Sequence, residues 1–399
     1  MELIQDLKKL IKNNVEITDI MKNLNADVRA TFLQCYESCF DSHLKFNDAL
    51  ILKADSVVDY LQDELNTGHW SEVPIQTRQA FTCANYVKAL IVLHEGNIQK
   101  ALHCLDLGLL LGAPLNDNCS LLTESASLLT KTLDITTHLT ANNKRKAHSC
   151  GNEAFEKLRG LQVKSVKCPT LEQFTESYYT PKVPVKLQDC ISHWPACEKW
   201  TDLNYLLKIA GSRTVPIEIG SHYTDENWTQ KLMSLKDFIH NHYLGNSNSV
   251  GYLAQHNLFD QISELRNDIR VPDYCGLSRD YDEESCEPDI NAWLGPEGTV
   301  SPLHFDPKDN LLAQVYGTKQ ILLYSPDDSD CLYPHGDKLL FNTAQVDPYK
   351  PDAQTYPKFA SATVYKCLLE PGEMLFIPLK WWHHVTALDK SFSVSFWWK

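Results

Sequence analysis

The chain has 399 residues, of which 43% are hydrophobic and 22% charged, and its formal net charge is −14 at pH 7. This length supports two or three domains with a substantial core, and the composition is typical of a soluble globular protein. The acidic balance argues against a large nucleic-acid interface, which needs a basic surface, and suits a basic peptide partner, although many proteins are acidic without one. No apolar run approaches the ~18 residues of a membrane span.

The start of the chain predicts an amphipathic helix. Its apolar residues recur at helical spacing with lysines between them, namely Leu3, Ile4, Leu7, Leu10 and Ile11. It lacks the apolar core of a signal peptide, so we expect a nuclear or cytoplasmic protein. Thirteen cysteines without a C-x-x-C pair favour reduced, buried thiols over a disulfide framework or a zinc ribbon, and nothing local suggests a cysteine nucleophile.

Residues 1–142 are predicted to form an all-helical domain, because apolar residues keep helical spacing there and Gly and Pro are sparse. Residues 84–114 predict two helices joined at Gly96-Asn97, similar to one tetratricopeptide-like hairpin without a clear 34-residue repeat. No ligand cluster occurs in this domain, so we expect a role in interaction or support. Residues 143–161 form a polar linker, whose Lys144-Arg145-Lys146 triplet is either a weak nuclear signal or a set of solvated charges.

Residues 162–399 are predicted to form a second domain, a barrel or sandwich of short strands. Turn residues separate the strand-like runs VPVKLQ, TVPIEIG, SVGYLAQ, INAWLG, NLLAQVYG, QILLYSP, EMLFIPL and SFSVSFWW. Helices are expected over 201–211 and 228–244, packed outside the barrel. Gly317-Thr318 is expected to turn a hairpin, and residues 278–289 are expected to form a mobile surface loop.

Two motifs of this second domain suggest a metal site. His304 and Asp306 lie two residues apart in SPLHFD, so a strand sends both side chains to one face. His383 in FIPLKWWHH supplies a second histidine from a distant strand. Two histidines and one carboxylate form the ligand set that leaves adjacent positions open on a non-haem Fe(II). The alternative is a coincidence of core histidines.

Two further residues bear on this site. Because neighbours on a strand face opposite sides, only one of His383 and His384 can reach the metal, and the strand pattern does not choose between them. The other histidine is expected to face outward. Lys319 begins the strand after Gly317-Thr318, and its ammonium suits the far carboxylate of a dicarboxylate co-substrate that chelates iron at its other end. The alternative is a solvated lysine beside a turn.

The region from about residue 163 to residue 399 resembles the JmjC domain of the cupin-type 2-oxoglutarate oxygenases. The resemblance is carried by PVKLQDCISHWPA, RTVPIEIGSHYTDENW, VGYLAQHNLFDQI, INAWLGPEGTVSPLHFDP and FIPLKWWHHVTALDKSFSVSFWW. It implies an α+β fold in which an all-helical N-terminal domain precedes a double-stranded β-helix with flanking helices. It also implies Fe(II), 2-oxoglutarate and O2, with the first histidine of WWHH completing the ligand set His304, Asp306 and His383.

The resemblance also implies roles for residues around the metal. The 2-oxoglutarate contacts would be Tyr252, Ser301, Asn310, Lys319 and Trp397. Hydroxyl donors suit a carboxylate, whereas a tryptophan in a terminal apolar strand is by default a core residue. Glu218 and Trp293 would line the pocket for a basic side chain, through a carboxylate for a guanidinium and an aromatic wall for a cation. An outward, solvated Glu218 stays open, because it lies on an alternating strand.

The resemblance favours hydroxylation of arginine side chains in protein substrates. Demethylation of histone methyl-lysine, by the same oxidation on an N-methyl group, is the alternative that would make the protein a chromatin regulator. A carboxylate pocket suits unmodified arginine better than dimethyl-lysine, which prefers an aromatic cage. Two other hypotheses are a non-catalytic cupin scaffold and a metal-dependent sugar isomerase. We expect a monomer that binds a basic protein or peptide, containing arginine or lysine, and neither nucleic acid nor membrane.

Overall fold

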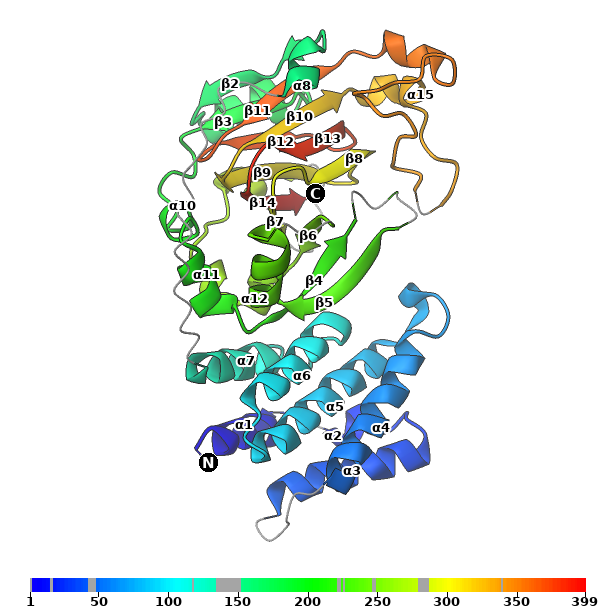
Figure 1. The fold of residues 1–399 in the computed structure, drawn as a ribbon, viewed down its shortest axis with the longest axis vertical. Coiled ribbons are helices and arrows are strands. Elements are labelled where there is room, and N and C mark those ends of the chain that lie inside the picture. The colour runs from blue at the N-terminus through cyan, green and yellow to red at the C-terminus, as the bar shows by residue number, and fades with distance from the viewer. Residues whose placement is uncertain are drawn as a thin grey trace.

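The computed structural model describes residues 2–14, 17–41, 48–116, 118–133, 152–220, 224, 227–245, 249–278, 287–338 and 340–399. Figure 1 shows a helical region formed by the N-terminal part of the chain and a β-rich region formed by the rest. The predicted α+β class, with helices first and a cupin barrel second, is confirmed. The domain boundaries at residues 142 and 161 stay predictions, and the first of them lies within 134–151, outside the described residues.

The helical region packs around a continuous apolar core. Its helices are α1 (Glu2–Asn14), α2 (Ile17–Met21), α3 (Ala26–Phe40), α4 (Asp48–Leu65), α5 (Ile75–His94), α6 (Ile98–Leu111) and α7 (Leu121–Thr132). The central helix is α5, since nearly every side chain from Gln79 to Leu93 is buried. The predicted two-helix hairpin is α5 and α6. Gly96 takes a φ of 78° at the turn, and the Asn97 side chain accepts a hydrogen bond from the Lys100 N–H at the start of α6.

Two facing sheets form the barrel of the β-rich region, and its described strands number five in the smaller sheet and nine in the larger. The smaller sheet has the order β1 (Leu161–Gln162), β11 (Tyr365–Leu369), β10 (Lys319–Tyr324), β13 (Trp382–Ala387) and β8 (Val300–Phe305). The larger sheet has the order β2 (Lys164–Lys167), β3 (Val185–Gln188), β12 (Met374–Ile377), β9 (Asp309–Tyr316), β14 (Ser391–Trp398), β7 (Asp289–Gly295), β6 (Gly251–His256), β4 (Thr214–Ile219) and β5 (Thr229–Ser234). All eight predicted strand runs are strands.

Side-chain alternation on these strands separates the barrel interior from its outer layers. On β9, Leu312 joins the apolar cluster between the sheets, whereas Leu311 and Ala313 join the cluster under the covering helices. On β10, Ile321 faces the interior and Leu322 faces outward. Every second residue of a barrel strand therefore faces the interior, where polar side chains can gather. The candidate site lies in this interior.

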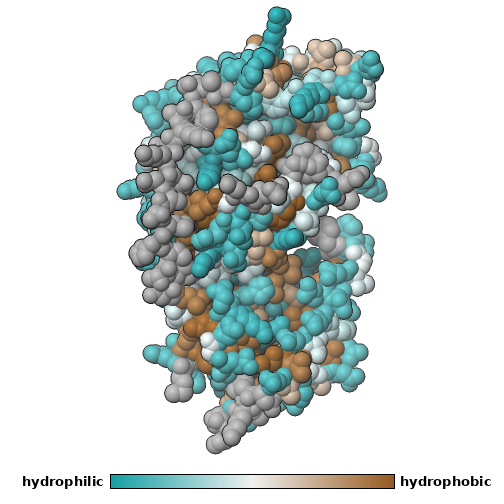
Figure 2. Space-filling model, viewed as in Figure 1, coloured by the Kyte–Doolittle hydropathy of each residue, from teal (hydrophilic) through white to brown (hydrophobic). Residues whose placement is uncertain are grey.

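Short helices cover the outer faces of both sheets. They are α8 (Glu153–Lys157), α9 (Leu171–Phe174), α10 (Ala196–Lys199), α11 (Leu203–Ala210), α12 (Leu235–Phe238), α13 (Leu258–Gln261), α14 (Ser263–Arg266) and α15 (Ser329–Leu332). Phe174, Leu206 and Phe238 pack into the cluster over the larger sheet, and Phe155 and Leu332 into the cluster over the smaller sheet. Hydrophilic side chains predominate on the face in Figure 2. No helix of the described chain is long and apolar enough to cross a membrane.

Two local predictions are wrong. Gly317-Thr318 does not turn a hairpin, because β9 belongs to the larger sheet and β10 to the smaller, so the chain crosses between sheets there. Gly317 has a φ of 74°, and a Cβ on it would lie 2.3 Å from the Lys390 carbonyl oxygen. The predicted helix over 228–244 begins instead as the edge strand β5, and only its second half is helical, in α12 and a π-helical turn over 239–243.

Other predictions fall partly outside the described residues. The Lys144-Arg145-Lys146 triplet lies there, as does most of the predicted loop over 278–289. Elsewhere the described cysteines are all free thiols, and Cys35, Cys39, Cys83 and Cys104 are buried, as predicted.

Candidate active site

Three side chains converge inside the barrel as a candidate metal centre. His304 lies on β8 and His383 lies directly opposite it on β13, while Asp306 follows β8 by one residue. The His383 Nε2 atom lies 3.5 Å from Asp306 Oδ2, and the His304 Nε2 atom lies 3.9 Å from Asp306 Oδ1. These separations are too long for hydrogen bonds but suit donors that share one ion with bonds of about 2.0–2.2 Å. Among the described residues this is the one group of three or more such donors.

Both histidines are oriented by backbone carbonyl groups. His304 Nδ1 lies 2.7 Å from the Pro302 oxygen, and His383 Nδ1 lies 3.0 Å from the Trp381 oxygen. A carbonyl can only accept, so each Nδ1 carries the proton and each Nε2 presents its lone pair to the site. Burial, with a smaller effect of His304, lowers the pKa of His383 to about 4. The His383 imidazole is therefore neutral near pH 7, the form that binds a metal.

The neighbouring His384 takes the opposite face of β13. It is only 6% exposed, and its ring meets the Tyr349 ring at a centroid distance of 5.2 Å. The prediction that the second histidine faces outward from the barrel is confirmed, and its ring is buried because residues 344–349 cover that face of the smaller sheet. The geometry leaves His383 as the histidine that converges on Asp306.

Lys319 places a buried ammonium in the same cavity. The side chain is 2% exposed, and its Nζ donates to the Tyr252 hydroxyl at 3.2 Å. Burial lowers the pKa of Lys319 to about 7, and no carboxylate contributes to that shift. The alternative of a solvated lysine beside a turn is therefore wrong. A buried cation without a protein counter-charge is the arrangement expected where a ligand supplies the anion.

Unsatisfied polar atoms in the cavity wall supply a second indication of a ligand. The cavity, together with the open solvent at its mouth, has a volume of about 360 Å³. Within it, Asp306 Oδ2, Asn310 Oδ1 and Trp397 Nε1 are buried and have no hydrogen-bond partner in the part of the chain that the structure describes. Asn310 and Trp397 lie opposite each other on β9 and β14, so their open positions face one space. An amide can turn either its donor or its acceptor to a ligand, and the indole N–H suits an oxygen. These residues fit a metal ion together with a polar dicarboxylate.

Glu218 lies beside a second, smaller cavity of about 220 Å³, and Tyr252 lines both cavities. Its carboxylate accepts a hydrogen bond from the Trp228 indole N–H at 3.3 Å, and burial raises its pKa. It is therefore half-buried rather than outward and solvated. Trp293 stands on the metal side, with its ring 6.1 Å from that of Tyr252 and its N–H donated to Ser395.

The structure brings nearly all the predicted site residues together. The larger cavity is lined by Tyr252, Trp293, Ser301, His304, Asp306, Asn310, Lys319, His383 and Trp397, and Glu218 lines the smaller one. A register shift between β8 and β13 lets both Ser301 and His304 face this cavity. Sequence analysis missed Ser395 and Trp228. Ser395 could have been found from the alternation of the last strand, which puts it on the same face as Trp397; Trp228 had no signal.

Comparisons with known proteins agree with this geometry. The cupin-like domain family matches residues 171–399. Lysine-specific demethylase 8 of Danio rerio is 40% identical to the chain, over 98% of the chain and 98% of its own length. Lysine-specific demethylase 8 of Xenopus tropicalis is 38% identical over 86% of the chain and 87% of its own length. The Jumonji C domain-containing protein 5 of Drosophila melanogaster is 37% identical over 99% of the chain and 96% of its own length.

The chain belongs to the JmjC-domain oxygenases of the cupin family. Members use Fe(II) and 2-oxoglutarate, and the three donors that line the larger cavity suit that metal. These relatives match nearly the whole chain, so the helical region is part of what they share with it.

Proposed function

We propose that this oxygenase hydroxylates arginine side chains in protein substrates, with Fe(II) and O2 and with 2-oxoglutarate as co-substrate. The observation that carries the proposal is the position of Glu218, a half-buried carboxylate in a cavity that shares Tyr252 with the metal cavity. A guanidinium held by this carboxylate would extend its side chain toward the metal donors. The pairing of Glu218 with Tyr252 across β4 and β6 supports this arrangement.

Each protein group has a role in this proposal. His304, Asp306 and His383 would hold the iron, which when bound supplies the oxidation of 2-oxoglutarate and of a substrate C–H bond by dioxygen. Lys319, aided by the hydroxyl groups of Tyr252 and Ser301, would hold the far carboxylate of 2-oxoglutarate. Asn310 and Trp397 would offer polar atoms to the rest of that molecule. Burial keeps bulk water from the reacting groups.

Two kinds of contact would recognise arginine, an ion pair with Glu218 and an aromatic contact with Trp293. The Trp228 N–H holds one oxygen of Glu218, which leaves the other oxygen to accept from a guanidinium. Trp293 would supply an aromatic wall for the same group. A raised pKa of Glu218 in the free protein is consistent with a carboxylate whose counter-charge arrives with the substrate.

Demethylation of methyl-lysine is the second candidate function, because two of the relatives carry the name lysine-specific demethylase 8. It would use the same metal and co-substrate but a different recognition pocket. Among the described residues, the lining of the smaller cavity has one carboxylate, that of Glu218, and the rings of Trp228 and Tyr252. A carboxylate pairs better with a guanidinium that keeps all its N–H donors, so we rank arginine first. A basic protein such as a histone, in the nucleus or cytoplasm, would suit either function.

The test is incubation of the protein with Fe(II), 2-oxoglutarate and matched peptides that differ only in one arginine or methyl-lysine. Hydroxylation adds 16 mass units to the peptide and demethylation removes 14. We expect the first with arginine, and we expect Glu218→Gln to slow it by about tenfold or more while 2-oxoglutarate binding stays intact. A loss of 14 on methyl-lysine alone would establish the second candidate. No succinate with any basic peptide would favour a non-catalytic scaffold.

A further inference from the structure

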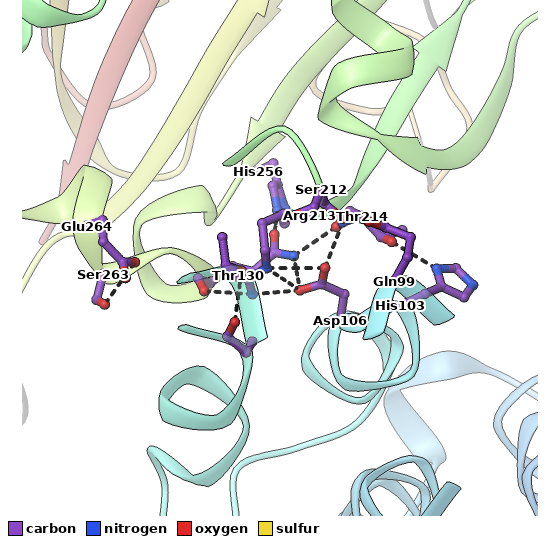
Figure 3. A network of polar contacts seen from close by, with 12 residues as sticks. Gln99, His103, Asp106, Thr130, Ser212, Arg213, Thr214, His256, Ser263 and Glu264 are labelled. Carbon is purple, nitrogen blue, oxygen red and sulfur yellow. Dashed lines mark hydrogen bonds and ion pairs between the residues drawn. The ribbon is translucent and has the colours of Figure 1, made fainter. Parts of the chain in front are cut away.

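A buried polar cluster joins the helical region to the β-rich region at the strands that carry Glu218 and Tyr252. We call it the interdomain cluster; its members are Asp106 of α6, Arg213, Thr214 of β4, His256 of β6, and Gln261 of α13. Figure 3 shows that Asp106 projects from α6 toward Arg213 and Thr214 of the β-rich region. Asp106 and Arg213 are 0% and 1% exposed.

Four donors from the β-rich region satisfy the Asp106 carboxylate. Arg213 donates through Nε at 3.0 Å and Nη2 at 2.6 Å, and Gln261 donates through Nε2 at 2.8 Å, all to Oδ1. The backbone N–H of Thr214 donates to Oδ2 at 2.7 Å. The fork of Arg213 and a backbone amide fix both the position and the rotation of the carboxylate. The helical region thus supplies the one anion that these donors share within the described structure.

The cluster also connects the ends of two site strands. Strands β4 and β6 are paired at only one end, where Glu218 lies opposite Tyr252. Toward the other end Gln261 bridges them, because its Nε2 donates to the Thr214 carbonyl at 2.8 Å and its Oε1 lies 2.7 Å from His256 Nε2. The Asp106 carboxylate accepts hydrogen bonds from this same Gln261 amide and from the backbone N–H of Thr214. The separation of the unpaired ends is therefore set by a side chain from the other region.

Contacts at the margins of the cluster hold the same segment from the same helix. Gln99 of α6 donates to the Ser212 carbonyl at 2.9 Å, and His103 Nδ1 lies 2.8 Å from the Thr214 hydroxyl (Figure 3). Thr214 stands four residues before Glu218, and His256 stands four residues after Tyr252. Both strands are therefore held at one end by α6 and its partners, while their site residues lie one strand length, about 13 Å, away.

We propose that Asp106 is a positioning residue for the reaction: it fixes β4 against β6 and thereby aims Glu218 at the substrate cation and Tyr252 at Lys319. The proposal rests on the proposed function for the identity of that cation. The helical region thereby supports the two strands that carry the substrate-binding residues. Removing the helical region, or displacing it from the β-rich region, changes substrate affinity. None of its side chains lines either cavity that the described residues form.

The kinetic test uses two variants and a control. Asp106→Asn keeps the shape of the side chain, whereas Asp106→Leu combined with Arg213→Met replaces the pair by apolar groups and avoids an unpaired buried charge. We expect both to raise KM for the arginine peptide by about five- to tenfold with kcat within about twofold of the wild type. The control Asp55→Asn removes an aspartate–lysine ion pair within the helical region, Asp55 with Lys88 at 2.8 Å, and is expected to leave KM unchanged.

A second measurement does not depend on turnover. Hydrogen–deuterium exchange of the full-length protein without metal should accelerate about tenfold in peptides over 214–219 and 251–256 of the double variant, and stay unchanged over 300–305 and 382–387. Equal acceleration in all four segments would mean a merely structural role and would overturn the proposal. So would unchanged exchange in the first two segments. If the wild-type protein hydroxylates nothing, the proposed function fails, and the exchange experiment still decides the role of Asp106.

Discussion

Two buried cations of this protein stand in opposite situations. Arg213 is 1% exposed, and an aspartate and a backbone carbonyl accept its hydrogen bonds. Lys319 is 2% exposed, yet it donates to a neutral tyrosine hydroxyl, and no ion pair with a described carboxylate accompanies it. Both cations lost their hydration on folding. Of the two, Arg213 alone is paired with an anion from the described residues.

The difference distinguishes buried polar groups that stabilise the fold from buried polar groups that are available to a ligand. A saturated cluster such as that of Asp106 and Arg213 has no capacity left for a ligand, so it acts by holding in place the elements that it joins. The cavity around Lys319 keeps open positions on Asp306, Asn310 and Trp397. Substitutions in the first cluster should therefore change stability and geometry, and substitutions in the second should change ligand binding and chemistry. Each of the following predictions can contradict that division.

The largest effect is expected at two adjacent histidines. His383→Ala removes a metal donor and should lower turnover at least about 1000-fold, which corresponds to roughly 4 kcal/mol of lost transition-state stabilisation. His384→Ala removes a ring that packs on Tyr349 outside the cavity and should cost less than about tenfold. Succinate formation measures both, and Mn(II) titration shows whether the metal is lost. Equal losses in the two variants would contradict the assignment of His383.

The next effect concerns stability. Asp106→Ala leaves Arg213 buried without an anion and should lower the free energy of unfolding by about 3–5 kcal/mol. Lys319→Met removes a buried ammonium that lacks a counter-charge and should leave that free energy unchanged or raise it. Urea unfolding followed by tryptophan fluorescence compares the two variants under one set of conditions. A larger loss for Lys319→Met than for Asp106→Ala would reverse the contrast between the two cations.

Sequence patterns predicted the site strands well because their signals are local. The alternation in the last strand, the two-residue spacing of His304 and Asp306, and the turn before Lys319 all mark strands that the structure contains. Family resemblance then added Tyr252, Asn310 and Trp397, whose types alone indicate little. The choice between His383 and His384 also needed that resemblance, because strand alternation gives two equal solutions.

The failures have a different physical origin. Leu232, Leu235 and Phe238 keep helical spacing across the boundary between β5 and α12, so periodicity extended one helix over an exposed edge strand. Gly317 looks like a hairpin turn, although the strands that it joins lie in different sheets. Asp106 and Arg213 are 107 residues apart, and an ion pair across two regions leaves no periodic signal.

The third prediction concerns the affinity for 2-oxoglutarate. Lys319→Met removes a charge-assisted hydrogen bond worth about 1.5–3 kcal/mol, so the Kd should rise about 10- to 150-fold. The control is Lys366→Met on the neighbouring strand β11, because Lys366 is also buried but donates to the Leu158 carbonyl. Titration calorimetry with Mn(II) in place of iron measures both. Similar affinities in the two variants would mean that the open ammonium of Lys319 is not the anchor.

The smallest effect concerns pH. The pKa of Lys319 in the free protein is lowered by burial to about 7, well below its usual value of 10.5. Below pH 7 the ammonium is present and affinity for 2-oxoglutarate should be flat. Above pH 7 the amine must take up a proton when the dianion binds, so affinity should fall with rising pH by at most about tenfold per unit.

Proton uptake gives this prediction its own measurement. Calorimetric titrations at pH 8 in two buffers of different ionisation enthalpy should show uptake approaching one proton per 2-oxoglutarate bound, because the carboxylate raises the pKa of Lys319 as it binds. The Lys319→Met variant should show neither the uptake nor the pH slope. An unchanged slope in that variant would assign the proton to another group. Uptake confined to the wild type would instead show that Lys319 is a neutral amine at pH 8 and becomes a cation when the co-substrate supplies its counter-charge.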